Sequence, residues 1–177
     1  MPHIRDRGFT LIELMVVVII IGILSVSVAF SVSQDSHRTA LREAHRLATL
    51  LEIAMAETQS GKRRLAWSAH PEGYEFLVAD ATGHAGDIGT LRWAPLIDDA
   101  TLHPRKLADD IRITRVDVDR QPLPAGSLLI LRRGDPPLFH IVLDTGGQTS
   151  SRMIELRSLP TGRVEVIRDS ASATSKP

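Results

Sequence analysis

Residues 7–25 read RGFTLIELMVVVIIIGILS. An uncharged apolar run follows Glu13 and extends from Leu14 to Ser33. A helix of that length, at about 1.5 Å per residue, spans roughly the 30 Å hydrocarbon core of a bilayer. A carboxylate beside such a run costs about 3 kcal/mol if it is drawn toward the bilayer centre. Glu13 therefore needs a compensating partner.

Two ordinary interpretations of this apolar run leave Glu13 unexplained. A secretory signal peptide has a shorter apolar core of about 7–15 residues before a small-residue cleavage site, and the small residues from Ser27 to Ser31 keep that interpretation open. A plain membrane anchor fits the length. Arg5 and Arg7 ahead of the run then predict a cytoplasmic N-terminus, with the rest of the chain translocated. Neither accounts for the order of residues just before the run.

That order resembles the N-terminal signature of the type IV pilin and pseudopilin family. The signature is a short basic leader, a Gly, an aromatic residue or Met, then Thr, Leu, a hydrophobic residue and Glu before an apolar helix. In this chain it is formed by Arg7, Gly8, Phe9, Thr10, Leu11, Ile12 and Glu13. The resemblance implies that a prepilin peptidase cleaves between Gly8 and Phe9 on the cytoplasmic side and N-methylates Phe9.

The same resemblance implies a role for Glu13. In the family, a Glu at this place pairs with the terminal amine of a neighbouring subunit during filament assembly. Such a pair is much stronger at low effective dielectric than in water, and either charge left alone there is penalised. Assembly would thus supply the compensating partner that the apolar run demands.

The helix is expected to continue beyond the apolar run as an amphipathic segment. Its apolar residues recur at spacings of three and four, the period of a half-buried helix: Leu41, Ala44, Leu47, Ala48, Leu51, Ala54 and Met55. Gly61 predicts a left-handed cap at its end, and the basic residues 62–64 suit the negative end of a helix. The sequence therefore predicts a transmembrane half over residues 9–33 and an amphipathic periplasmic half over residues 34–61.

After Gly61 the apolar period changes to two, which is typical of strands. Residues 65–68 and 74–78 flank the turn-like sequence His70-Pro71-Glu72-Gly73 and predict a hairpin. Further strands are expected at 91–93, 111–118, 127–132, 138–143, 153–156 and 163–167.

The predicted fold class is α+β. A long N-terminal helix packs on an antiparallel β-sandwich-like domain over residues 62–169. A cytoplasmic leader, residues 1–8, precedes the helix. Residues 82–89 predict a flexible loop, and residues 170–177 a disordered tail.

The succession of strands resembles one subgroup of the family, the H-type (GspH-like) minor pseudopilins of type II secretion systems. The segments that carry this resemblance are GYEFLV, LRWAPL, PLFHIVLD and TGRVEV. It implies a periplasmic pseudopilus that drives export of folded proteins across the outer membrane. The implied partners are the major pseudopilin, other minor pseudopilins in a tip complex, the prepilin peptidase and the inner membrane. The chain would cross that membrane once, with a cytoplasmic N-terminus and a periplasmic globular domain.

The alternative is a minor type IV pilin (FimT/FimU-like) for pilus assembly or DNA uptake. Some FimT-like pilins bind DNA with a Gly-Arg-x-Arg pattern, but here Gly162-Arg163-Val164-Glu165 has an acid in place of the second Arg. The chain balances 21 basic against 21 acidic residues, so a nucleic-acid partner is not expected. Acids are interleaved among the basic residues that could form a patch: Arg132, Arg133, Arg152, Arg157, Arg163 and Arg168. Many such pilins hold a C-terminal loop by a disulfide, and the absence of Cys favours secretion.

No catalytic or metal site is predicted, which argues against an anchored periplasmic enzyme. The seven histidines lack the helical spacing of a zinc hydrolase, and no Gly-x-Ser-x-Gly motif is present. The acidic groups 98–99, 109–110 and 117–119 lack the Gly and the closing Glu of a calcium-binding EF-hand, and predict solvated turns. We therefore expect a structural subunit without catalytic residues, metal or cofactor.

Overall fold

The computed structural model describes residues 11–79, 92–145 and 152–168, apart from the side chains of residues 24–36, 152 and 168. The chain divides into two compact units, Met1–Asp35 and Ser36–Pro177. Helix α1 (Leu11–Gln59) contributes to both units. The expected leader, the loop at 82–89 and the tail at 170–177 lie outside the described residues.

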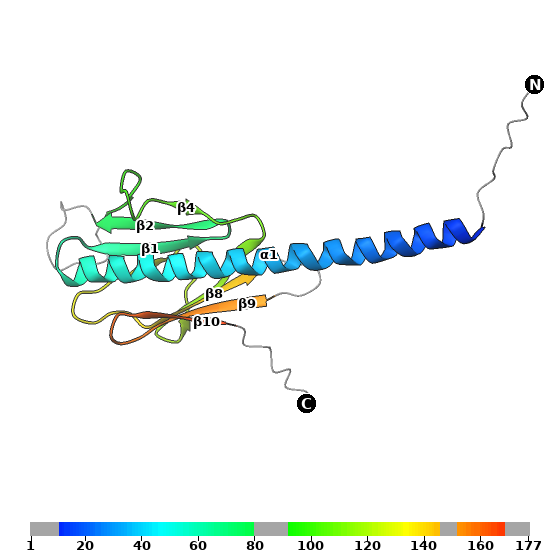
Figure 1. The fold of residues 1–177 in the computed structure, drawn as a ribbon. Coiled ribbons are helices and arrows are strands. Elements are labelled where there is room, and N and C mark those ends of the chain that lie inside the picture. The colour runs from blue at the N-terminus through cyan, green and yellow to red at the C-terminus, as the bar shows by residue number, and fades with distance from the viewer. Residues whose placement is uncertain (1–10, 80–91, 146–151, 169–177) are drawn as a thin grey trace, which may run out of the picture. The chain divides into compact units, whose positions relative to one another are not determined.

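The second unit contains two antiparallel sheets of five strands each (Figure 1). In the first sheet the order is β3-β2-β1-β7. Strand β2 pairs with β4 as well as with β3. Its strands are β1 (Leu65–His70), β2 (Gly73–Ala79), β3 (Trp93–Pro95), β4 (Arg105–Lys106) and β7 (Leu128–Ile130). The second sheet has the order β10-β9-β8-β5-β6. Its strands are β5 (Ile111–Val118), β6 (Gln121–Pro122), β8 (Phe139–Thr145), β9 (Arg152–Ser158) and β10 (Val164–Arg168).

The predicted antiparallel architecture is confirmed, with corrections at strand ends. The first hairpin forms as expected, because His70 pairs with Gly73 across the two-residue turn Pro71–Glu72. The strand expected at 91–93 instead occupies Trp93–Pro95. Strands β4 and β6 were not predicted, because two residues are too short to show an alternating pattern.

One apolar core joins the second half of α1 to both sheets. The buried helix residues include the predicted Ala44, Leu47 and Leu51, and they pack with Trp67 of β1 and Ile141 of β8. Figure 1 shows this half of the helix running alongside β1 and β8. The amphipathic prediction is therefore confirmed, with two adjustments: Leu41 is only half-buried, and Ala40 and Leu50, which were not predicted, are buried in the core.

The helix ends as its sequence predicts. Gly61 has φ of +76°, a conformation that costs L-residues steric energy. The Gly61 N–H donates to the Thr58 carbonyl at 3.0 Å, and the Lys62 N–H donates to the Glu57 carbonyl at 3.2 Å. These two bonds are the Schellman motif, and they turn the chain toward β1.

Two polar side chains of α1 bind backbone groups of the sheets. Glu52 Oε1 accepts the N–H of Val164, the first residue of edge strand β10, at 2.8 Å. The Gln59 amide donates to the Arg132 carbonyl at 3.1 Å and accepts the Gly134 N–H at 2.8 Å, so it pins the segment between β7 and β8. The helix therefore positions the sheets through specific hydrogen bonds as well as through apolar packing.

Candidate functional site

The first candidate site is the start of α1. Apolar side chains from Leu11 to Ile23 are exposed, from 42% at Val17 to 77% at Leu11. A helix that is apolar on every side requires nonpolar surroundings. Among the helical residues that the structure describes, no stretch is both long and apolar enough to cross a membrane.

Glu13 is the acidic residue in the first turn of α1, and its side chain is exposed. A carboxylate there is favourably placed, because the N-terminus of a helix carries partial positive charge. The predicted cleavage and methylation residues, Gly8 and Phe9, lie outside the described residues. The structure thus places Glu13 on an exposed apolar helix but does not test its pairing with a neighbouring amine.

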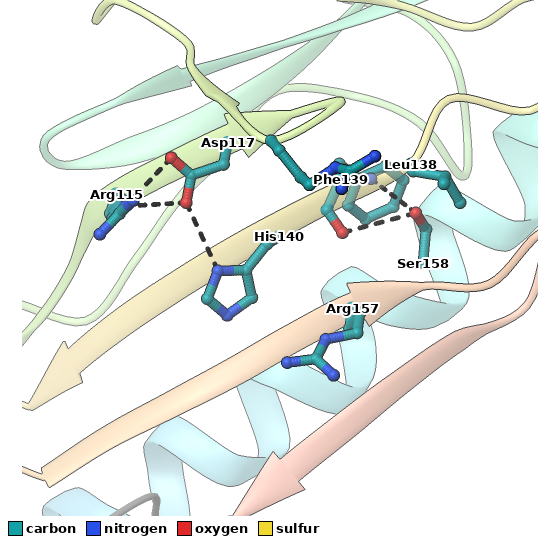
Figure 2. A pocket seen from close by; sticks show the side chains of 8 residues that line it. Arg115, Asp117, Leu138, Phe139, His140, Arg157 and Ser158 are labelled. Carbon is teal, nitrogen blue, oxygen red and sulfur yellow. Dashed lines mark hydrogen bonds and ion pairs between the residues drawn. The ribbon is translucent and has the colours of Figure 1, made fainter. Parts of the chain in front are cut away.

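The second candidate site is a pocket of about 410 Å³ on the second sheet (Figure 2). It lies at the end of the sheet where the β5–β6 turn, the start of β8 and the end of β9 meet. The lining residues are Arg115, Asp117, Arg120, Leu138, Phe139, His140, Arg157 and Ser158. The pocket therefore combines several cationic groups with an apolar side.

The pocket has an ion-pair network on the outward row of the sheet. Asp117 is opposite His140 across β5 and β8, and His140 is opposite Arg157 across β8 and β9. Arg115 Nε lies 2.7 Å from Asp117 Oδ2. The two ring nitrogens of His140 lie 3.5 Å from Asp117 Oδ2 and 3.0 Å from Glu155 Oε2. Asp117 was expected in a solvated turn, and this is corrected: it lies within β5 and is buried, with Arg115 and His140 as its partners.

Ser158 has a structural rather than a nucleophilic environment. Its buried hydroxyl accepts the Phe139 N–H at 2.7 Å and donates to the Pro137 carbonyl at 3.0 Å. His140 is engaged with carboxylates instead of with Ser158, so the nucleophile–base contact that activates a serine is missing from the pocket. Within the described ranges, no three His, Asp, Glu or Cys side chains are grouped to hold a metal ion.

The remaining predicted groups mostly serve the fold. His70 lies 3.1 Å from Glu75, and His103 lies 3.2 Å from the Asp99 carbonyl oxygen, whereas His84 is outside the described residues. Asp99 was expected in a solvated turn, but it accepts the N–H groups of Thr101 and Leu102 and an Arg63 hydrogen bond. The Leu102 N–H and the Arg63 guanidinium hold the pKa of Asp99 at about 2.

Sequence reasoning missed the pocket because its residues come from three separate segments of the chain. Arg157 was noted only as one of several scattered basic residues, and Arg120 and Leu138 carried no signal of their own. The pair Pro136-Pro137 just before Leu138 restricts the backbone there, and it is the one local feature that could have drawn attention.

Comparison with known proteins agrees with the helix-and-sheets arrangement and with the N-terminal signature. The family model for the prokaryotic N-terminal methylation motif matches residues 4–29. A solved structure of the minor pseudopilin EpsH from the type 2 secretion system of Vibrio cholerae superposes with a TM-score of 0.53. That match covers 73% of this chain and 96% of EpsH at 15% sequence identity. The fold is that of a minor pseudopilin.

A curated relative is similar over part of its length. Type II secretion system protein H of Klebsiella michiganensis is 35% identical over 74 residues. The match spans 42% of this chain and 40% of that protein. The resemblance to H-type pseudopilins stated from the sequence is thus supported by both a pseudopilin fold and a partial sequence match.

Proposed function

We propose that this chain is an H-type minor pseudopilin of a type II secretion system. Its work would be structural: it would join other pseudopilins in a periplasmic filament that drives export of folded proteins. The observation that carries the proposal is the pseudopilin fold together with a prepilin methylation motif on the same chain. The partial match to a type II secretion protein H favours this function over that of a type IV pilin.

The proposal includes how the chain reaches the filament. Residues 1–8 would be a leader that a prepilin peptidase removes between Gly8 and Phe9, with methylation of the new Phe9 amine. Residues 9–33 would be held in the inner membrane as a single pass and residues 62–169 would be periplasmic. In support, the apolar side chains between Leu11 and Ile23 are exposed, and such a surface is stable only in lipid or against other apolar helices.

Processing is tested by mass spectrometry of the full-length protein extracted from its host membrane. The expected mature chain is residues 9–177 with one methyl group on Phe9. A Gly8→Ala variant is the control. It keeps a small residue at the cleavage site, so we expect cleavage to be reduced and not abolished. A terminus near Ser31 would instead identify an ordinary signal peptide and would overturn this part of the proposal.

The secretion role is tested in the host by deleting the gene and measuring export of folded proteins to the medium. We expect export to fall and to recover when the full-length chain is supplied in trans. Normal export accompanied by loss of surface pili or of DNA uptake would show that the chain is a type IV pilin subunit.

A further inference from the structure

The pocket on the second sheet holds an exposed apolar side chain beside cations that form no ion pair within the described part of the chain. We propose that it is a docking site for an acidic segment of a neighbouring protein subunit, one that places a carboxylate next to an apolar side chain. The inference rests on the proposed function in one respect: the chain must work within an assembly of several subunits.

Leu138 supplies the apolar contact. It is 46% exposed at the pocket while its neighbour Phe139 is buried below it. In the described part of the second unit, Leu138 and Ile97 are the large hydrophobic side chains that are most exposed. A lone exposed Leu is ordinary, and Leu138 becomes a contact of interest only through the charged groups beside it in the pocket.

Two guanidinium groups line the same pocket as Leu138. The Asp117 carboxylate, on the same pocket wall, is already bound by Arg115 and His140. Arg120 and Arg157 also line the pocket, are exposed, and make no ion pair with any residue that the structure describes. Figure 2 shows Arg157 extending from β9 beside His140. Guanidinium groups bind carboxylates with paired, geometrically specific hydrogen bonds, so the free charges select an acidic occupant.

The backbone holds this arrangement in place at a conformational cost. Asp119 and Arg120 form the β5–β6 turn with φ of +50° and +67°, values that Gly or Asn adopt at less cost. The Asp119 N–H donates to the Leu138 carbonyl at 2.7 Å, which joins the turn to the apolar residue. The Ser158 hydroxyl fixes the residues on either side of Leu138. This two-residue turn positions Arg120 at the pocket.

The nearby acids favour a short protein segment over nucleic acid. Asp117 lines the pocket and Asp119 and Glu155 lie close to it, and Asp117 and Asp119 are paired with Arg115 and Arg132. The phosphate backbone of a nucleic acid crossing this surface would be repelled by these carboxylates. A single carboxylate with an apolar neighbour needs only the pocket itself, whose volume of about 410 Å³ suits one or two side chains.

The proposal is tested by photo-crosslinking in the intact host membrane. A photoreactive amino acid replaces Leu138 in the full-length chain, and the adduct is compared with that of the same chain carrying Arg120→Glu and Arg157→Glu. We expect an adduct to another protein of the assembly, and an at least about tenfold loss on charge reversal. The crosslinked peptide should contain Asp or Glu next to an apolar residue. Arg64→Glu, an exposed arginine outside the pocket, is the matched control and should leave the adduct unchanged.

Several outcomes would overturn the proposal. They are the absence of an adduct, an adduct that survives both charge reversals, and an adduct to lipid, to nucleic acid or to a second copy of this chain. If deletion of the gene abolishes export while the charge-reversed chain still exports normally and crosslinks normally, the docking site is wrong and the proposed function stands. Unimpaired export after deletion would refute the function separately.

The Arg120→Gly variant tests whether loss of folding could explain a weaker crosslink. Glycine adopts the positive φ of the turn at less cost, so this variant should melt at a higher temperature than the parent chain. It should nevertheless crosslink less, because one guanidinium is gone. A variant that is more stable and crosslinks as strongly as the parent would show that Arg120 has no part in docking.

Discussion

At the scale of single residues, charged side chains stabilise a turn of this protein. Arg63, just after the helix cap, donates to Glu57 of α1 and to Asp99 of the turn between β3 and β4. Arg63 Nη1 lies 2.7 Å from Asp99 Oδ2. The pair is mostly shielded, since the Asp99 side chain is 17% exposed. It connects the end of the helix to a turn 36 residues further along the chain.

Asp99→Asn should destabilise the protein at neutral pH by about 2 kcal/mol. The bonds from Leu102 N–H and Arg63 lower the pKa of Asp99 from 3.8 to about 2. Folding thus favours the charged form, and the resulting stability is present above pH of about 4 and is lost as the pH falls through about 2. Denaturant unfolding between pH 7 and pH 2 measures it.

Asp98→Asn is the matched control for this measurement. Asp98 is the exposed neighbour, and it makes no ion pair with the residues that the structure describes. It should leave the unfolding free energy almost unchanged at every pH. An Asp99→Asn variant whose unfolding curve parallels that of the parent chain across the acid range would contradict the expected role of the carboxylate.

At the scale of elements, α1 does more than cover the sheets. Its apolar stripe fills the core, its Schellman motif redirects the chain into β1, and Glu52 and Gln59 bind backbone groups of distant segments. Edge strands and loops carry unpaired N–H and C=O groups, which cost free energy when they are left without partners. The helix therefore gives a partner to one N–H of edge strand β10 and to two backbone groups of the segment between β7 and β8.

Gly61→Ala should lower the free energy of unfolding by about 1 kcal/mol, because a Cβ is disfavoured at φ of +76°. The new Cβ would lie 3.1 Å from Nη1 of Arg133, a flexible side chain that can move, so the backbone conformation should dominate the cost. Gly61→Asn is the informative comparison, since Asn tolerates this region better and should lose less. Equal losses in thermal unfolding would point to the Arg133 contact instead.

Glu52→Ala should loosen the edge strand β10 without unfolding the domain. The change removes the acceptor of the Val164 N–H, and a hydrogen bond of this kind contributes about 1 to 3 kcal/mol. Hydrogen exchange should accelerate at Val164 and remain near the parent value in β8. Glu52→Gln keeps an acceptor oxygen and should retain most of the protection. Unchanged exchange at Val164 in the Ala variant would show that the bond adds nothing to the edge.

At the scale of the whole molecule, the proposed function would depend on contacts that one chain cannot make alone. The first unit exposes apolar residues along its helix and carries Glu13 in the first turn. The second unit has its own core and a cationic pocket. Under the proposed function, the first unit would serve filament assembly and the second would meet other subunits.

Glu13→Ala should leave membrane insertion intact and impair docking into the filament. An apolar helix gains by losing a carboxylate, whereas under the proposed function a neighbouring terminal amine would lose its partner at low dielectric. The measurements are membrane fractionation, crosslinking to the major pseudopilin and export. Glu72→Ala, on an exposed turn, is the control. Unchanged crosslinking and export would mean that the carboxylate is incidental, and failed insertion would indicate a role in targeting.

The features of this protein that depend on local pattern could be predicted from the amino-acid order. Apolar spacing predicted the buried stripe from Ala44 to Met55, Gly61 predicted the left-handed cap, and alternation predicted most strands of both sheets. These succeed because helical period, strand period and the steric freedom of glycine are properties of neighbouring residues. The tertiary structure alone decided the burial of Asp117, the bond from Glu52 to β10 and the meeting of Arg120, Leu138 and Arg157 at one pocket. Those features depend on strand order and register, which bring together side chains far apart in the chain and which no local pattern encodes.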